Sequence, residues 1–271
     1  MKHNYPIGDC GKSWLYPLFM NRRTFLAMSI AASMPTIAAE PDTRCFEMRV
    51  YFAAPGKLDE LQKRFRDHTT KLFTKHGMTN LGYWTPAENP DNKLIYVLAY
   101  PNRAARDASW KGFMADADWQ AAYKASEVKG KLVAKAESTF MQATDYSPAI
   151  KASSAAPRVF ELRTYTTTPG NLPKINARFR DHTVNLFAKH GMTNLFYWNL
   201  QSGQPGTDNT LVYLLAHKDA DAMAASFKAF RADADWVAAK DASEKAAGGS
   251  LTVPDGVKSV LMNATDYSET K

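Results

Sequence analysis

Cysteine is scarce in this sequence, with only Cys10 and Cys45 among 271 residues. Cys10 falls in an N-terminal leader that we expect to be removed, so an intramolecular disulfide would lose one of its partners. We therefore expect Cys45 to be a free thiol with a structural role. No Cys-x-x-Cys pair is present, which excludes that redox or zinc-binding pattern.

The common catalytic signatures are also missing. The sequence has no G-x-G-x-x-G after a strand, no phosphate-binding P-loop, no H-E-x-x-H and no G-x-S-x-G. These absences exclude the usual nucleotide-binding, zinc-protease and serine-hydrolase functions. No zinc site is expected, because a closed one needs three or four ligands.

Strong charge and long apolar runs are lacking too. The formal net charge is +7, of which +3 belongs to residues 1–39, and the remaining positive charge is dispersed. A nucleic-acid partner is therefore not expected. After the leader no uncharged run approaches 18 residues, so we expect a soluble mature protein without membrane contact.

Residues 1–39 are typical of an export leader, with Met20 as the expected true start. Arg22 and Arg23 precede an uncharged run that ends at Ala39, a pattern of the twin-arginine (Tat) type. We expect cleavage after Ala39 and a periplasmic or secreted mature protein. An uncleaved membrane anchor is the alternative, but the apolar run is short and contains a proline.

The rest of the chain consists of two copies of one segment. Residues 64–84 and 178–198 are identical at 17 of 21 positions, and further matched blocks extend on both sides. The copies differ in length only at 201–209 and 247–256, so these insertions are expected in loops. We predict domains at 43–147 and 158–268, joined by an Ala, Ser and Pro-rich linker at 148–157.

Hydrophobic periodicity predicts the same elements in each copy. Alternation over 46–52 indicates a strand, and apolar steps of three and four up to Gly77 indicate an amphipathic helix. Strands are predicted at 78–84 and 94–100, a helix at 104–129 that could restart at Asp116 or Asp118, and a closing strand at 138–146.

The resulting order, β-α-β-β-α-β, predicts an α+β fold of two tandem ferredoxin-like domains. Each sheet would be covered by helices on one face only. Because the second copy is tethered by a short linker, the two open faces can meet within one polypeptide. We therefore predict an intramolecular dimeric α+β barrel, an internal pseudo-dimer.

Two histidines are the candidate catalytic residues. His68 and His182 fall on the apolar stripe of their helices and are expected to point toward the sheet. A core histidine held by a backbone carbonyl is one interpretation. A pocket base or an axial metal or haem ligand is the other, since neutral imidazole serves either role. His76 and His190 are instead expected in the last helical turn, where the macrodipole favours imidazolium.

Candidate ligand-binding residues lie on the strands. Glu-x-Arg-x-Tyr places three polar side chains on one strand face of each copy: Glu47, Arg49 and Tyr51, and Glu161, Arg163 and Tyr165. Exposed cross-strand pairs are one interpretation. If the barrel closes over this face, the triads become internal and could orient an anionic ligand. Trp84 and Trp198 are also candidates, although aromatic residues at such positions are more often core.

These motifs resemble the NIPSNAP domain, present here twice. The resemblance is carried by FEMRVY and FELRTY followed by Pro-Gly, by the helix ending in KHG, by the strand ending in YW and by ADADW. It implies a dimeric α+β barrel fold, whose superfamily includes cofactor-independent monooxygenases and haem-degrading enzymes. Tyr96 and Tyr213 stand where the family often has a histidine, and we include them among the candidate ligand-binding residues.

The expected function is binding of a small aromatic or anionic ligand in pockets between helices and sheet, with no reaction specified. A cofactor-independent monooxygenase or a haem-binding or haem-degrading enzyme is the first alternative, and a non-catalytic protein-interaction module is the second. No cofactor is required by the sequence, and haem is the one that the resemblance suggests. The second copy has Phe196 in place of Gly82, so the two pockets need not be equivalent.

Overall fold

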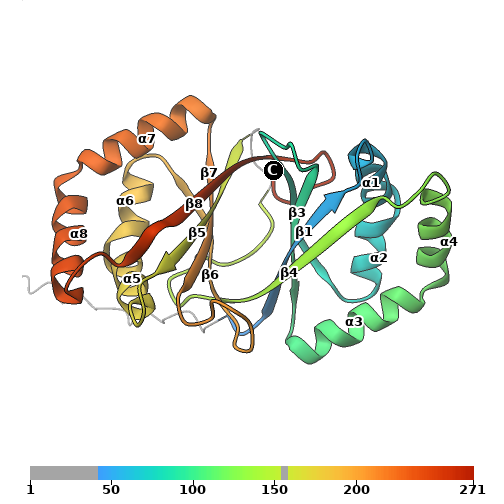
Figure 1. Cartoon of the computed structure of the whole chain (residues 1–271), viewed down its shortest axis with the longest axis horizontal. Helices are drawn as coiled ribbons and strands as arrows, with labels where there is room; N and C mark the ends of the chain where they lie inside the picture. Colours follow the sequence, from blue (N-terminus) through green and yellow to red (C-terminus); the bar gives the residue numbers. More distant parts are fainter. Residues whose placement is uncertain (1–41, 154–157) are drawn as a thin grey trace, which may run out of the picture. The chain divides into compact units, whose positions relative to one another are not determined.

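The computed structural model describes residues 42–153 and 158–271, which belong to one compact unit (Figure 1). We call these two ranges repeat 1 and repeat 2. The predicted leader, residues 1–39, and part of the predicted linker, residues 154–157, lie outside the described residues. Within the two described ranges, no helix is both long enough and apolar enough to cross a membrane.

Both repeats follow the predicted order of elements. Repeat 1 consists of β1 (Cys45–Ala53), α1 (Leu58–Arg64), the π-helix η1 (Phe65–Thr69), α2 (Thr70–Lys75), β2 (Thr79–Pro86), β3 (Lys93–Tyr100), α3 (Arg103–Ala115), α4 (Ala117–Ser126) and β4 (Val133–Ala143). Repeat 2 consists of β5 (Val159–Thr167), α5 (Leu172–Arg178), the π-helix η2 (Phe179–Thr183), α6 (Val184–Lys189), β6 (Thr193–Leu200), β7 (Thr210–His217), α7 (Ala220–Ala232), α8 (Ala234–Ala247) and β8 (Thr252–Ala264).

Side-chain caps and a glycine fix the helix ends. Asp116 caps the N-terminus of α4 by accepting hydrogen bonds from the backbone N–H groups of Asp118 and Trp119, so the predicted restart falls at Asp116. The first helical segment ends at Gly77, whose φ of 77° is left-handed as a C-terminal cap requires. In repeat 2, Asp233 caps the N-terminus of α8, and Gly191 has the left-handed φ that ends the first helical segment.

The eight strands form one closed antiparallel barrel in the order β1-β3-β2-β8-β5-β7-β6-β4. Each repeat contributes a four-stranded sheet, and the sheets join at two short seams. Trp84–Pro86 of β2 pair with Met262–Ala264 of β8, and Met141–Ala143 of β4 pair with Trp198–Leu200 of β6. The prediction that two open sheet faces meet in one barrel-like core is confirmed.

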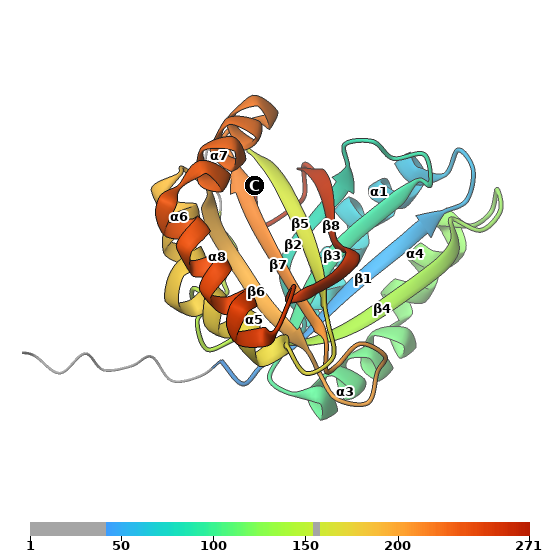
Figure 2. The same cartoon turned by 60° about the vertical axis from the view of Figure 1, so that its left-hand side comes forward.

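The alternation of β1 separates two chemically different layers. Phe46, Met48 and Val50 face the barrel interior, whose core contains residues of both repeats. Glu47 and Arg49 point the other way, toward the helices that lie outside the barrel (Figures 1 and 2). The barrel therefore closes over the apolar face, and the polar triads lie between sheet and helices, so the condition under which barrel closure would enclose them is not met. The apolar face closes the barrel because it can be buried without unpaired polar groups.

The segments that follow β4 and β8 cross to the opposite repeat. Thr144 donates its backbone N–H to Tyr197 of repeat 2, and Thr265 donates in the same way to Tyr83 of repeat 1, at 3.0 and 2.9 Å. Ile150 of the predicted linker is 4% exposed and packs in the barrel core. This reciprocal exchange ties the repeats together beyond the two strand seams.

Candidate functional site

A π-helical turn in each repeat decides where the candidate histidines point. In η1 the backbone N–H of Thr70 bonds to the carbonyl of Phe65, an i to i+5 bond that places one extra residue in the turn. The buried position therefore moves from His68 to Thr69, which is 2% exposed. His68 and His182 are both exposed, so the prediction that they point toward the sheet is wrong.

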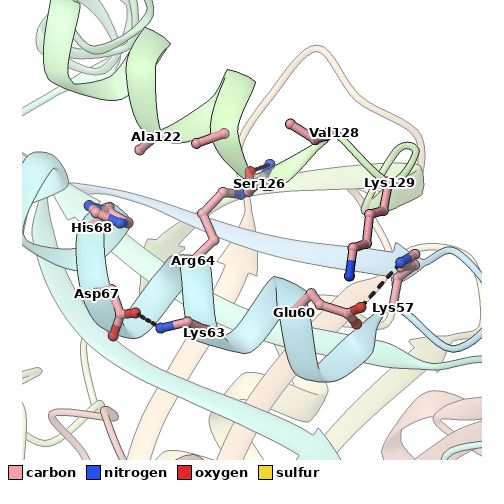
Figure 3. Close-up of a pocket in the computed structure, with 11 residues that line it drawn as sticks. Lys57, Glu60, Lys63, Arg64, Asp67, His68, Ala122, Ser126, Val128 and Lys129 are labelled. Carbon is pink, nitrogen blue, oxygen red and sulfur yellow. Dashed lines mark hydrogen bonds and ion pairs between the residues drawn. The ribbon is translucent and has the colours of Figure 1, made fainter.

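His68 lies in a charged groove between the first helix and α4 (Figure 3). The groove has a volume of about 360 Å³ and contains two internal ion pairs, Lys57 with Glu60 and Lys63 with Asp67. A groove so open and charged does not fit axial ligation of a haem, which needs an enclosed apolar site. In the described part of the chain there is also no cluster of three His, Cys, Asp or Glu residues that could hold a metal ion.

His76 and His190 have structural partners. His76 follows the last helical residue, as predicted, and its Nε2 lies 2.6 Å from Asp116 Oδ2. His190 and Asp233 repeat this contact at 2.7 Å. Each histidine thus links the end of the first helical segment to the cap of the second.

The polar residues that converge between helices and sheet in repeat 1 centre on Glu47, which is fully buried. Arg49 donates from Nη1 at 2.7 Å, and Arg106 of α3 donates from Nε and Nη2 at 2.9 and 2.7 Å. Tyr100 and Trp110 each donate at 3.1 Å, and Ser138 of β4 donates as well.

This network keeps Glu47 ionised. Burial alone would raise the pKa of Glu47, but the hydrogen bond from Arg106 and the charge of Arg49 outweigh it and hold the pKa at about 2. Two arginines share this one carboxylate, and Arg106 also pairs with the exposed Asp107 at 3.1 Å.

A cavity of about 480 Å³ opens beside this network, between β1 and β4 on one side and α3 and α4 on the other. Arg49 and Arg106 reach it from the Glu47 cluster, and Arg64 reaches it from α1. The cavity also has an aromatic lining made of Tyr51, Phe65, Phe73, Trp110, Phe113, Trp119 and Tyr123. Arg64 lines the outer groove as well, so it stands between groove and cavity.

The cations in and beside the cavity outnumber the anions. Arg49, Arg64, Arg106 and Lys131 are the lining cations. Against them stand Glu127, which pairs with Arg64 at 3.0 Å, and Glu47 behind the wall. Arg106 also pairs with the exposed Asp107 at 3.1 Å, so four cations and three carboxylates leave one positive charge in excess. A concave, aromatic and positively charged site can hold a planar anion.

The remaining candidate residues divide between the two layers. Tyr96 lies on the helix side of the sheet and accepts a hydrogen bond from Arg49 Nε at 3.0 Å, and Tyr213 is its counterpart in repeat 2. Trp84 and Trp198 lie in the barrel core instead. The structure therefore separates these tryptophans from Glu47, Arg49 and Tyr51.

Repeat 2 carries a reduced version of the Glu47 network. Glu161 accepts hydrogen bonds from Arg163 at 2.7 Å and from Ser259, which match Arg49 and Ser138. The positions of Arg106 and Trp110 are occupied by Met223 and Phe227, and that of Tyr100 by His217. Repeat 2 thus lacks the second arginine of the cluster.

Sequence reasoning missed Arg106, Trp110, Tyr100 and Ser138 as members of the site. They come from α3, β3 and β4, and only the tertiary fold brings them to Glu47. The sequence nevertheless distinguishes three of these positions. Tyr100, Arg106 and Trp110 differ from their counterparts in the second copy, although the two copies are otherwise similar.

Two helix-backed antiparallel sheets that close one barrel define this chain as an α+β barrel protein with both halves in a single polypeptide. The NIPSNAP family model matches residues 46–148 and 160–249. The chain therefore belongs to the NIPSNAP family.

Solved structures resemble the whole unit or one repeat. A proposed monooxygenase from Fusobacterium nucleatum is 13% identical over 84% of this chain and 95% of its own, with a TM-score of 0.56. An anthrone oxidase-like protein is 9% identical over 87% and 97%, with a TM-score of 0.54. A NIPSNAP domain protein of unknown function from Burkholderia xenovorans is 27% identical over 38% and 98%, with a TM-score of 0.34. No curated protein matches the chain.

Proposed function

We propose that the chain binds a small aromatic anion in the cavity of repeat 1. The observation that carries this proposal is the pair of arginines, Arg49 and Arg106, fixed by the single buried carboxylate of Glu47 at the wall of an aromatic cavity. Arginine side chains held in place by other contacts lose little freedom when they bind a carboxylate in bidentate fashion.

The aromatic wall supports a planar ligand. Trp110 stacks on Arg49, with 4.4 Å from the guanidinium carbon to the ring centroid. Trp119 and Tyr123 both lie 5.3 Å from Arg64. A planar ring between these groups would bury apolar area while its carboxylate meets the cations.

The proposal predicts that Arg106→Met, which installs the residue of repeat 2, weakens binding of an aromatic carboxylate at least tenfold. Glu47 keeps its bonds from Arg49, Tyr100, Trp110 and Ser138, so the variant should fold. Binding of 1-naphthoate is measured by quenching of tryptophan fluorescence, since Trp110 and Trp119 line the cavity.

Lys258→Met serves as the matched control, because Lys258 is an exposed cation on β8 of repeat 2. It removes the same charge without touching the cavity and should leave naphthoate binding unchanged. Equal affinity in the Arg106 variant and the control would refute the proposal.

Oxygenation of the bound ligand is the second candidate function. It is favoured by the resemblance of the whole unit to a proposed monooxygenase and to an anthrone oxidase-like protein. The test is oxygen uptake with anthrone, which reacts with one O₂ to give anthraquinone and water. Uptake that equals the rate without protein would exclude this activity for anthrone.

Two expectations about the whole chain are also proposals. The strand order β4-β1-β3-β2 within repeat 1 supports a ferredoxin-like assignment for each repeat. Export by the twin-arginine route rests on Arg22 and Arg23 and on the uncharged run that ends at Ala39. The N-terminal residue of protein purified from the periplasm would test it, because cleavage after Ala39 leaves Glu40 first.

A further inference from the structure

Repeat 2 contains a buried histidine that sequence analysis did not single out. His217 is the last residue of β7, its side chain is 1% exposed, and its Nε2 lies 3.3 Å from Glu161 Oε2. Burial would raise the pKa of Glu161, but hydrogen bonds from His217, Ser259 and Arg163 and the charge of Arg163 lower it. An ionised carboxylate only accepts hydrogen bonds, so the Nε2 of His217 carries the proton that it donates.

The other ring nitrogen of His217 is left without a partner. With Nε2 protonated, Nδ1 of a neutral imidazole is an acceptor. This Nδ1 is buried and makes no hydrogen bond to any residue of the described ranges. A buried unpaired acceptor costs about 1–3 kcal/mol, so it calls for an explanation such as a bound water or a ligand.

A second unpaired atom lies in the same cluster. Arg163 donates from Nη1 to Glu161, but its Nε is buried and has no partner among the described residues. His217 and Arg163 bind opposite oxygens of one carboxylate, and the ring of Phe227 lies 5.9 Å from the His217 ring and 4.8 Å from the Arg163 guanidinium carbon. An acceptor, a cationic donor and an aromatic face are thus brought together.

The comparison with repeat 1 indicates what this cluster can bind. In repeat 1 two arginines share Glu47, and Tyr100 fills the position of His217. In repeat 2 a single arginine, Arg163, balances Glu161. The side chains of Arg49 and Arg163 are exposed to a similar extent, 14% and 15%.

We propose that the helix-sheet layer of repeat 2 is a second ligand site, which takes a neutral phenol and accepts its hydroxyl proton at Nδ1 of His217. In that step the phenolic O–H bond breaks, its electron pair stays on the oxygen as phenolate, and the proton forms an N–H bond at Nδ1. Glu161 stabilises the imidazolium that results, and Arg163 stabilises the phenolate. This site does not depend on anion binding in repeat 1.

The test uses 4-nitrophenol as the probe, because its phenolate absorbs in the visible range and its phenol form does not. The Arg106→Met variant is used as the background, so that anion binding in repeat 1 contributes little. We expect this protein to bind the probe and to raise the fraction of nitrophenolate above that of the free probe in the same buffer.

His217→Tyr is the informative variant. Tyrosine is the residue of repeat 1, where its hydroxyl donates to Glu47, so the variant keeps a donor for Glu161 and removes the acceptor. We expect at least a tenfold loss of probe affinity and loss of the additional nitrophenolate absorbance. His182→Gln is the matched control, because His182 is an exposed histidine of the same repeat, and it should behave like the background protein.

Nitrophenolate absorbance that persists in His217→Tyr would overturn the proposal. If that variant does not fold, ¹⁵N spectra of histidine-labelled wild-type protein decide the question. The proposal expects one histidine with a protonated Nε2 and a bare Nδ1 whose resonance shifts on addition of 4-nitrophenol, and a resonance that does not respond refutes it. A failed naphthoate test at Arg106 would leave these outcomes unaffected.

Discussion

At the scale of single residues, Glu47 shows how the site is held together. Its carboxylate accepts hydrogen bonds from five different side chains that belong to β1, β3, α3 and β4. Buried charges are stable only when paired and hydrogen-bonded. Glu47 is therefore both the anchor of Arg49 and Arg106 and a pH-sensitive point of the fold.

Acid should destabilise the protein through Glu47. Its pKa is about 2 in the folded chain against an ordinary value of 4.5. A carboxyl with a lowered folded pKa contributes stability that is fully present above 4.5 and is lost as the pH falls from 4.5 toward 2. Urea unfolding at a series of pH values should show the free energy of unfolding falling over this interval.

Glu47→Gln isolates this contribution. The variant should lose about 3–5 kcal/mol at neutral pH, because two half-buried arginines lose the buried carboxylate that they share. It should also lose less stability than the wild type between pH 4.5 and 2. Glu88→Gln, at an exposed position, is the control and should keep the wild-type pH profile. Parallel profiles for Glu47→Gln and the wild type would argue against this role.

The sequence could predict part of this site and no more. The triad of Glu47, Arg49 and Tyr51 was found from strand alternation, and the structure places it beside a cavity. Arg106 and Trp110 could not be assigned, because their contact with Glu47 depends on how α3 packs on the sheet. His68 was placed on the wrong face, because helical periodicity of 3.6 does not anticipate a π-turn.

At the scale of elements, the copies keep the contacts that join the first helical segment to the second. Asp116 caps α4 and also bonds to Lys75 and His76, and these bonds hold its pKa well below the usual range. The same set recurs in repeat 2 around Asp233. This duplication indicates a structural role for the ADADW motif and for the histidine of the KHG motif.

Removal of the Asp116 cap should destabilise the helices that cover the sheet. Asp116→Ala is expected to lower the free energy of unfolding by about 1–2 kcal/mol, since α4 loses its cap. Asp118→Ala is the control, because Asp118 is exposed and, among the described residues, its side chain pairs with Lys75 alone, so its loss should cost less than about 1 kcal/mol. The two variants are compared by urea denaturation, and equal losses would contradict the capping role.

At the scale of the whole molecule, neither repeat buries the inner face of its own sheet. The barrel core mixes residues of both halves, and the tail after β8 returns to repeat 1, where Tyr267 packs in the helix-side core. The duplication therefore supplies each sheet with its partner. The tether replaces association between two chains by an intramolecular contact.

Isolated repeat 1, residues 42–153, should not persist as a monomer. Its inner sheet face, which includes Met48 and Val97, would be exposed to water, and it would lack Tyr267. Sedimentation velocity of isolated repeat 1 should show dimers or aggregates. In urea denaturation, the intact chain should unfold in a single transition. A folded and monomeric repeat 1 would contradict this account.

The sequence by itself determined the duplication, the order of the elements and the helix ends, because these follow from local periodicity and from side chains that bond to nearby backbone. Tertiary structure decided which face of each strand closes the barrel, since the two faces compete and only packing of the whole unit selects the apolar one. It also turned His68 outward and brought Arg106 and Trp110 to Glu47, because those positions depend on a π-turn and on helix packing rather than on spacing along the chain.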